Sequence, residues 1–505
     1  MYLVINLGLK SIRGIVFDVN ANQLFSSSRE VSTMLYNQRV EQDANEWKIK
    51  LDSILYEISN IDSLKKKIKF ITSTTSSSCV YGVDNFGTPL TEVIMVSDKR
   101  AILESEEIGS MIKKENPNSL LSCPASSMIP KALWYKRNNL EVFDNIKYWF
   151  GAGEFINHYF TSKFFTDPLN ASKSLYENKG YLKNIINKVG IDINTLVEVE
   201  DIGYDVSVSN NLIKEYNFNQ NCKYILTTYD AICAVIGSND VDKNTACDVS
   251  GTVTSLRILS DKGLSKTKGT IFSQELLGFN KHLIGSSNNL GGGIIEWLKQ
   301  AFYNQNFKNV YSTMETNAMK SLVGAHGVVF LPYLLGERSP FKNHNSRGVF
   351  FGMDRSTSIN EFSRAAFEST AYVTRDLLDL IVLNGVEVDS INVSGGLARI
   401  DLINQIKADV TNKRVKQIQN FESTAVGSLI LLLISIGEYK SISEASSNII
   451  KVKKIYNPSK ENYKIYNEFF DFYKELNKVM YPMYEKHLKL KSKTESYMFK
   501  NLRNL

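Results

Sequence analysis

The sequence contains few metal-binding or disulfide-forming side chains, with five cysteines and five histidines in 505 residues. No two cysteines form a Cys-x-x-Cys pair, and the histidines show no ligand spacing. Neither a disulfide framework nor a zinc site is therefore expected. This sparse, odd number of thiols favours a reduced, soluble protein of the cytoplasm.

Long apolar runs are also missing. The longest candidate, VGSLILLLISIG at residues 426–437, is shorter than the roughly 18 residues that a membrane span requires. It is therefore predicted to be a buried helix. The N-terminus lacks a basic segment before an apolar stretch and enters a strand directly, so no signal peptide is expected.

The chain has no large excess of one charge. It has 59 basic and 53 acidic residues, a net charge of +6, and the charges are scattered along the sequence. This pattern disfavours a nucleic acid as partner. Only residues 483–505 are more basic, and we interpret them as a solvated terminal helix or a frayed tail rather than a binding surface.

The composition is that of a globular protein with a large core, at 43% hydrophobic and 22% charged residues. The length allows two large domains or three smaller ones. Strand-like segments at 69–73 and 79–83 alternate with helical patterns such as 44–59. This alternation predicts an α/β fold.

Two segments have the pattern of a strand, a tight turn and a second strand. The first, VINLGLKSIRGIVFD at 4–18, offers backbone N–H groups, Lys10, Ser11 and Arg13, which suit phosphate oxygens. On these residues alone, an ordinary cationic hairpin is the favoured interpretation. The second, ACDVSGTVTSLRILSD at 246–261, repeats the pattern. The repeat suggests two similarly built halves, divided near residue 242, with a ligand cleft between them.

The most specific motif is FLPYLLGERSPFKNHNSRGVFFGM at 330–353. A predicted helix at 359–384 follows, and then the strand, Gly-Gly turn, helix and strand of 391–415. Five further motifs precede this one in the same order as in the FGGY carbohydrate kinases. They are VEQDANEW at 40–47, VSDKRA at 96–101, IPKALW at 129–134, FTDPLNASKSLY at 165–176 and LGGGIIEWL at 290–298. The chain resembles that family over residues 1 to about 480, and GERSP…RGVFFG is most similar to xylulokinases.

The resemblance implies two actin-like, ribonuclease H-like domains of α/β class with an interdomain catalytic cleft. The N-terminal domain would span 1–242, the C-terminal domain 243–482, and a basic tail 483–505. ATP and Mg²⁺ are the implied cofactors, and a sugar or polyol hydroxyl is the implied acceptor. A homodimer is the default assembly, with neither nucleic acid nor membrane as partner.

The resemblance also implies roles for single residues. Both hairpin turns become phosphate loops, and the nucleotide would be bound by Gly8, Lys10, Ser11, Arg13, Gly251, Thr252, Gly292, Gly395 and Gly396. The Gly396 turn would begin a helix whose N-terminus favours an anion. Asp230 would be the general base, whereas the residues alone predict only a helix N-cap there.

The sequence departs from the family at the metal position. Asn6 stands where the family has an Asp that holds magnesium through water, which removes a charge. We hypothesise that Asp248 replaces part of that charge, the alternative being a strand-end Asp with no metal.

Further departures surround the acceptor. Serines replace the Gln-Met-His of xylulokinases at 76–78, Val96 replaces a Trp, and Tyr229 and Ala231 flank Asp230 in place of Gly and of Asn or Gln. The candidate acceptor-binding residues are Ser77, Ser78, Asp98, Arg100, Tyr229 and Ala231. Asp98 and Arg100 either reach the substrate or pair at the surface. These changes predict a kinase whose acceptor is not plain xylulose. The alternatives are a weak paralogue that only binds its ligands and, less favoured, an actin-like structural protein.

Overall fold

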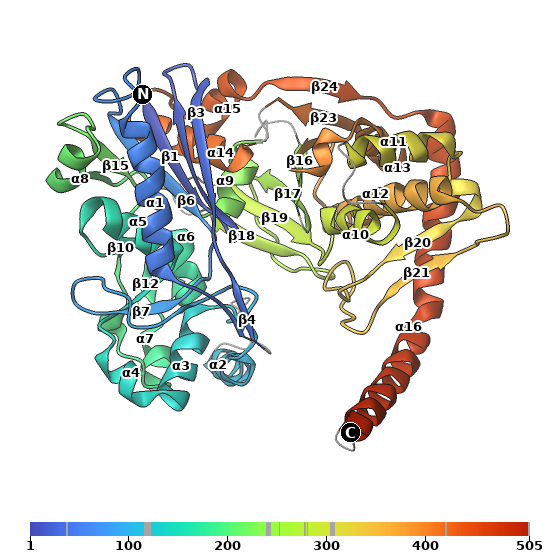
Figure 1. The fold of residues 1–505 in the computed structure, drawn as a ribbon, viewed down its shortest axis with the longest axis horizontal. Helices are drawn as coiled ribbons and strands as arrows, with labels where there is room; N and C mark the ends of the chain where they lie inside the picture. Colours follow the sequence, from blue (N-terminus) through green and yellow to red (C-terminus); the bar gives the residue numbers. More distant parts are fainter. Residues whose placement is uncertain are drawn as a thin grey trace. The chain divides into compact units, whose positions relative to one another are not determined.

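The structure is a computed structural model that describes residues 1–36, 39–115, 123–238, 244–251, 253–276, 279, 281–303, 309–419 and 422–502, with side chains up to residue 494. Its contacts group the chain into two compact units, coloured by sequence in Figure 1. Unit 1 comprises Met1–Gly237, Leu277–Phe279 and Ser423–Ile449, and unit 2 comprises Ser238–Leu276, Asn280–Glu422 and Ile450–Leu505. The segment Ser423–Ile449 thus groups with unit 1, although the sequence places it inside the second predicted domain.

Unit 1 is built on a six-stranded mixed sheet. Its strands, in spatial order, are β14 (Asp205–Ser207), β15 (Lys223–Ile225), β6 (Phe70–Thr75), β1 (Tyr2–Leu7), β2 (Ser11–Phe17) and β3 (Gln23–Glu30). Strands β1, β2 and β3 form an antiparallel meander, whereas β6 runs parallel to both β1 and β15. The first predicted hairpin is therefore β1–β2.

Unit 2 is built on a seven-stranded mixed sheet with the same neighbour relations. Its strands, in spatial order, are β18 (Phe272–Leu276), β19 (Lys281–Ser287), β17 (Thr254–Ser260), β16 (Thr245–Ser250), β22 (Ser390–Ser394), β23 (Arg414–Ile418) and β24 (Val452–Tyr456). The β16–β17 hairpin again lies between an antiparallel strand and two parallel ones. The predicted α/β class and the two similarly built halves are confirmed.

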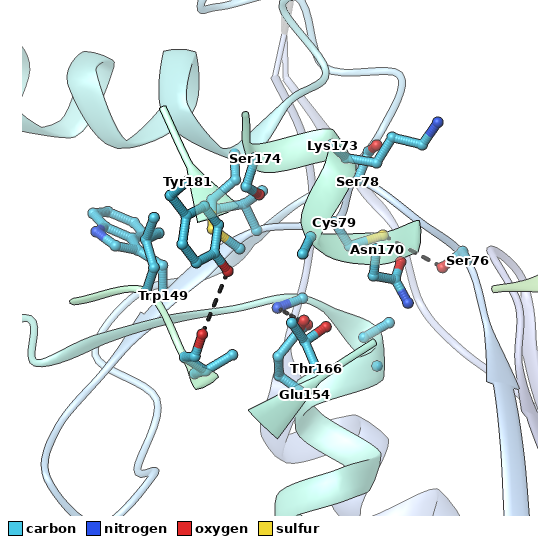
Figure 2. A pocket seen from close by; sticks show the side chains of 18 residues that line it. Ser76, Ser78, Cys79, Trp149, Glu154, Thr166, Asn170, Lys173, Ser174 and Tyr181 are labelled. Carbon is cyan, nitrogen blue, oxygen red and sulfur yellow. Dashed lines mark hydrogen bonds between the residues drawn. The ribbon is translucent and has the colours of Figure 1, made fainter. Parts of the chain in front are cut away.

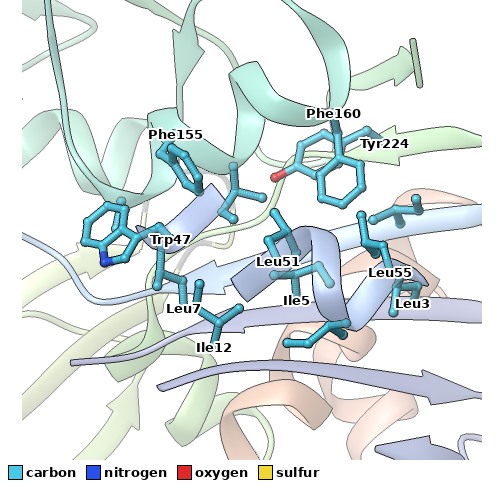
Figure 3. Close-up of a cluster of buried hydrophobic side chains, with 14 of the residues drawn as sticks. Leu3, Ile5, Leu7, Ile12, Trp47, Leu51, Leu55, Phe155, Phe160 and Tyr224 are labelled. Carbon is cyan, nitrogen blue, oxygen red and sulfur yellow. The ribbon is translucent and has the colours of Figure 1, made fainter. Parts of the chain in front are cut away.

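Helix α1 (Ala44–Ser59) covers the unit 1 sheet over the residues that the apolar spacing predicts. Asp43 caps its first turn by accepting a hydrogen bond from the Asn45 N–H. The buried face of the helix presents Trp47, Leu51 and Leu55 to the sheet residues Leu3, Ile5, Leu7 and Ile12 (Figure 3). This packing fixes the strands that carry the first loop.

Three further predicted elements are present. Helix α12 (Ile359–Leu383) begins at a capping box of Ser358 and Glu361, and α13 (Asp401–Thr411) connects β22 to β23. The apolar run near residue 430 forms the buried helix α14 (Ser423–Ser435). Among the described residues, no helix is both long and apolar enough to cross a membrane.

Candidate active site

The first loop joins β1 to β2 and is held by its own backbone and by one side chain. Gly8 N–H donates to the Ser11 carbonyl at 3.0 Å, and the buried Gln42 amide donates to the Leu9 carbonyl at 2.8 Å. Trp47 donates in turn to Gln42 at 2.9 Å. Gln42 and Trp47 of the VEQDANEW motif therefore hold the loop through the Leu9 carbonyl, while Lys10 stays exposed.

Two side chains of this hairpin lie on one face of the sheet. Asn6 in β1 is directly opposite Arg13 in β2, and residues opposite one another in an antiparallel pair project to the same side. On its other side Asn6 neighbours Thr74 of β6. The hairpin thus offers an amide and a guanidinium together, close to the end of β6.

The serines that follow β6 are fixed by a buried lysine. Ser76 N–H donates to the Leu7 carbonyl at 2.8 Å, and Ser78 has a positive φ of 64°. Lys131, from helix α3 (Met128–Asn138), donates to the Ser78 carbonyl at 2.7 Å and to the carbonyls of Ile94 and Met95. Its ammonium thus links Ser78 to Ile94 and Met95, the two residues just before the 96–101 motif.

Burial lowers the pKa of Lys131 from 10.5 to about 8. The unfolded chain therefore binds more protons than the folded one between these values, and stability should rise with pH across that window. We expect the stability advantage of the wild type over Lys131→Met to grow by about 2–3 kcal/mol between pH 7.5 and pH 10. Urea unfolding at several pH values measures it. Lys136→Met is the control, since Lys136 also donates to two carbonyls but is only partly buried; equal pH trends for the two variants would contradict the prediction.

A small cavity lies against this serine segment (Figure 2). Ser76, Ser78, Asn170, Lys173 and Trp149 are among the residues that line it. Its volume of ≈ 30 Å³ suits one or two waters, not a sugar. Ser77 is not among its lining residues.

Asp98 and Arg100 form a buried ion pair, contrary to the surface alternative. Arg100 donates to both carboxylate oxygens of Asp98, at 2.9 and 2.8 Å, and to Glu41 at 2.6 Å. Its guanidinium lies 4.9 Å from the ring centre of Trp134. Burial acts to raise the pKa of Asp98, but hydrogen bonds from Arg100 and from the Val40 N–H outweigh it and lower the pKa. The pair fastens the 96–101 segment to β5 (Arg39–Gln42).

Asp230 is the first residue of helix α9 (Asp230–Ile236), while Tyr229 occupies the N-cap position. The prediction of an N-cap at 230 is therefore wrong by one residue. Ala231 follows within the first turn, and the Lys173 ammonium lies 5.3 Å from the centre of the Tyr229 ring. These residues lie together in unit 1.

The turn before α9 is anchored by Asp167, which the sequence reasoning did not select. Thr228 donates to Asp167 at 2.8 Å, and Asp167 also caps helix α6 (Pro168–Ala171) through the N–H groups of Leu169 and Asn170. Burial raises the pKa of Asp167 to about 6. The FTDPLNASKSLY motif could have indicated this role, since Asp before Pro is a helix-start signal.

Helix α9 is also held by close backbone contact with α14. A Cβ at Gly427 would lie 1.8 Å from the Cys233 carbonyl oxygen, and one at Gly237 would lie 1.9 Å from that of Ser423. Only glycine permits this approach. Asp230 therefore begins a helix with little freedom to shift.

The second loop follows β16 in unit 2, and Asp248 behind it is fully engaged. Lys407 of α13 lies 2.5 Å from Asp248 and donates to Ser250 at 3.1 Å. Thr374 donates to Asp248 at 3.1 Å, and Ser250 donates to its other oxygen. These partners favour the alternative of a strand-end Asp with no metal, and the hypothesis that Asp248 replaces part of the metal-site charge stays a prediction. Within the described residues, no three His, Cys, Asp or Glu side chains are grouped to hold a metal.

The glycines of unit 2 fall into two groups. A Cβ at Gly292 would lie 2.3 Å from the Gly251 carbonyl oxygen, and Gly395 has a φ of +86° with its Cβ position 2.7 Å from the Ser250 oxygen. Gly291 is equally restricted, because a Cβ there would lie 2.1 Å from Thr254 Oγ1. Gly251 and Gly396 are different: both are exposed, and no atom lies within 4 Å of either Cβ position. Thr252 lies outside the described residues.

The helix expected directly after Gly396 begins later. Gly396 leads into the three-residue 3₁₀ turn η4 (Leu397–Arg399), and α13 starts at Asp401. The anion-favouring helix N-terminus is thus separated from the Gly-Gly turn.

The GERSP motif fastens the segment before helix α10 (Gly292–Phe302). Glu337 accepts hydrogen bonds from the N–H groups of Asn289 and Arg338, and Arg338 donates to the Ser287 and Asn288 carbonyls. Burial raises the pKa of Glu337 to about 7. The GERSP motif therefore stabilises the backbone of residues 287–289 in unit 2.

Comparisons with known proteins agree with this architecture. The family models named "FGGY family of carbohydrate kinases", N-terminal and C-terminal domains, match residues 1–237 and 270–436. A xylulose kinase of Staphylococcus epidermidis is 26% identical over 495 residues, with 94% of this chain and 96% of that protein covered. A gluconokinase of Bacillus subtilis is 23% identical over 501 residues, with 95% and 96% covered. The gluconate kinase structure from Lactobacillus acidophilus has a TM-score of 0.85 at 21% identity, with 96% and 99% covered.

Proposed function

Because the chain belongs to the FGGY family of carbohydrate kinases, we propose that it transfers the γ-phosphoryl group of ATP to a hydroxyl of a sugar or polyol, with Asp230 as the general base. One observation carries the choice of base. Asp230 begins a helix that Thr228, Asp167 and two glycine contacts hold in place. A base must be held in position before it can act, and the fixed start of this helix supports the choice of Asp230.

The proposed reaction conserves atoms and charge in one displacement. Asp230 takes the proton of the acceptor hydroxyl while the acceptor oxygen bonds to the γ-phosphorus. The bond from that phosphorus to the bridging oxygen breaks, and ADP leaves with the electron pair. Such transfer depends on positioning and charge stabilisation more than on covalent catalysis. In this proposal Arg13, Lys10 and the N–H groups of both loops stabilise the phosphate charge.

The nucleotide is proposed to lie against Gly251 and Gly396, because the fold itself does not require glycine at either position. We expect Gly251→Ala and Gly396→Ala to raise KM for ATP about tenfold while stability stays equal or gains about 0.4–1 kcal/mol. Gly292→Ala and Gly395→Ala are the matched pair, expected to lose about 1–3 kcal/mol of stability through strain and overlap. Steady-state kinetics and thermal unfolding measure both. Unchanged KM values in the first pair would remove these glycines from the nucleotide site.

Magnesium is proposed to bind together with the ATP phosphates. Their negative charge would replace the carboxylate that Asn6 lacks. Mg²⁺ keeps several waters and uses few protein ligands, so the single amide oxygen of Asn6 fits as a neutral partner. We expect Asn6→Asp to lower the Mg²⁺ concentration for half-maximal rate several-fold. A titration of rate against Mg²⁺ at saturating ATP tests this, with Asn20→Asp, an exposed asparagine of unit 1, as the control. An unchanged midpoint would exclude Asn6 from the metal's surroundings.

The acceptor is proposed to differ from plain xylulose. Short serine side chains at 76–78 and the methyl group of Ala231 leave more room and fewer fixed donors than the residues they replace. Ser77, Ser78, Tyr229 and Ala231 remain the proposed contacts, whereas Asp98 and Arg100 are proposed to act through the segment that they fasten. Relatives include a xylulose kinase and a gluconokinase, so both ketoses and sugar acids belong among the candidates.

A panel of acceptors tests the proposal. ADP release with Mg-ATP is followed for ketoses, aldoses, polyols, sugar acids and heptoses, beside the same panel with Asp230→Asn. One acceptor whose signal the variant loses would identify both the substrate and the base. If ATP binds but no acceptor in the panel causes ADP release, the second candidate is favoured, which is a paralogue that binds nucleotide and sugar without efficient turnover. Asn6 and Ala231 are the observations that favour that candidate.

A further inference from the structure

The turn at residues 76–79, here called the serine turn, follows β6 in unit 1 and contains unused hydrogen-bond donors. Ser77 and Ser78 each offer a hydroxyl and a backbone N–H, and Cys79 offers a further N–H. None of these groups donates to an acceptor within the residues that the structure describes. Cys79 is only 1% exposed, so its N–H is also shielded from bulk solvent. A buried donor of this kind is normally satisfied by a bound water or by a ligand.

The serine turn directs one of these donors away from a buried cation. Lys131, which is 0% exposed, donates to the Ser78 carbonyl at 2.7 Å. In a trans peptide the carbonyl and the following N–H point in opposite directions, so the Cys79 N–H points away from Lys131. Ser78 has a left-handed backbone with a φ of 64°. A residue of this conformation within a turn brings successive N–H groups to one concave side, where an anion binds.

Lys131 gives the serine turn a positive charge that is not bonded to an acid. Its ammonium donates to three backbone carbonyls, and no carboxylate bonds to it in the described part of the chain. Asp98 and Arg100 also act on this lysine, with opposite signs. A cation behind a group of N–H and hydroxyl donors strengthens the binding of an anion more than that of a neutral oxygen.

Two further charged residues line the cavity beside the serine turn. Glu154 is one, but its carboxylate already accepts the Gly151 N–H at 2.7 Å, and burial raises its pKa, which favours the neutral form. Lys173 is the other, and it lies beside Ser78 in Figure 2. The charged groups that bond to the turn or line its cavity are therefore two ammonium groups and one carboxylate of raised pKa.

The serine turn and Asp230 lie at the same edge of the unit 1 sheet. They follow β6 and β15, which are parallel neighbours, so both stand at the carboxyl ends of strands, where ligands bind in α/β folds. Burial raises the pKa of the Cys79 thiol, and the Asp230 carboxylate adds to that rise, so the two groups are close. One small acceptor thus reaches both, with a hydroxyl at Asp230 and its other end at the turn.

We propose that the acceptor is a sugar acid, whose carboxylate binds the serine turn while one of its hydroxyls lies at Asp230. This inference rests on the proposed kinase function and specifies its acceptor. A carboxylate only accepts hydrogen bonds, which suits a site made of donors, whereas a sugar hydroxyl would leave its own proton unpaired there. A phosphate ester carries up to two charges, so it would meet stronger repulsion from the nearby Asp230 than a carboxylate does.

Calorimetry with the full chain tests the class of acceptor. Gluconate and glucitol form one pair and xylonate and xylitol another, since the members of each pair differ only in the acid at the first carbon. We expect the acid of at least one pair to bind about tenfold more tightly than its alditol. Acids that bind no better than the alditols, or that do not bind, would overturn the proposal. Tighter binding of glucose 6-phosphate than of either acid would overturn the choice of a carboxylate.

Ser77→Asp and Ser77→Asn test the place of binding, because the two new side chains have nearly the same shape and differ in charge. We expect Asp to weaken binding of the acid about tenfold more than Asn does, while the affinities of the two variants for the alditol differ less than about twofold. Ser63→Asp, at an exposed position of unit 1, is the control for added charge. Thermal unfolding shows that each variant is folded. Equal affinity of the Asp and Asn variants for the acid would exclude the serine turn as its site.

Turnover separates this inference from the kinase function on which it rests. Tight binding of the acid without ADP release would contradict the kinase function and leave the acid site in place. ADP release with neutral sugars, at a kcat/KM equal to or above that of the matched acids, would contradict the acid site and leave the kinase function in place.

Discussion

Replacing Asp230 by Asn is expected to lower kcat by about 10²–10⁴-fold while KM for ATP and the melting temperature change little. Asn keeps the size and the hydrogen-bonding shape of Asp at the first position of α9 but cannot take a proton. If the acceptor hydroxyl loses its proton to Asp230 in the transition state, the loss appears in kcat. Initial rates across acceptor and ATP concentrations separate the two constants.

A purely structural part for Asp230 gives a different result. A carboxylate in the first turn of a helix stabilises it by about 0.3–1 kcal/mol through the helix dipole, and Asn would forfeit that without stopping turnover. Asp401→Asn is the matched control, because Asp401 is the first residue of α13. A small fall in kcat, shared by both variants and accompanied by similar losses of stability, would exclude Asp230 as the base.

The sequence predicted those helices and hairpins whose apolar residues follow a short local pattern. Helix α1 follows from apolar residues at helical spacing after the Asp43 cap, and both hairpins follow from two apolar runs around a small-residue turn. These signals lie within twenty residues of one another, so they can be recognised without knowing what the segment packs against.

The candidate site was predictable only where a motif marked it. Asp230 and the glycine turns were selected by resemblance, but their supports come from distant parts of the chain. Lys131 reaches back to Ser78, and Asp167 reaches forward to Thr228. Nothing in a lysine within a helix, or in an Asp before Pro, states which distant carbonyl or hydroxyl it will meet. Asp98 and Arg100 show the same limit, since two residues near in sequence gave no sign that Glu41 would complete their pair.

The buried pair of Asp248 and Lys407 is the strongest example, because 159 positions separate the two residues. Both side chains are almost fully buried, at 0% and 1% exposed. We expect Lys407→Met to destabilise the protein by about 3–5 kcal/mol, since it leaves a buried carboxylate without its cation. Chemical denaturation measures the loss.

The double variant Asp248→Asn/Lys407→Met is expected to recover much of that stability, because it removes both charges together. Lys454→Met is the control: its partner Asp401 lies 2.6 Å away, but both side chains are about half exposed, so a change below about 1 kcal/mol is expected. Ser250 adds a second readout, since it hydrogen-bonds to both members of the pair and directly precedes Gly251. Loss of the pair should therefore also raise KM for ATP in the folded single variant. If Lys407→Met lost no more stability than Lys454→Met, the buried ion pair would make no net contribution to the stability of the protein.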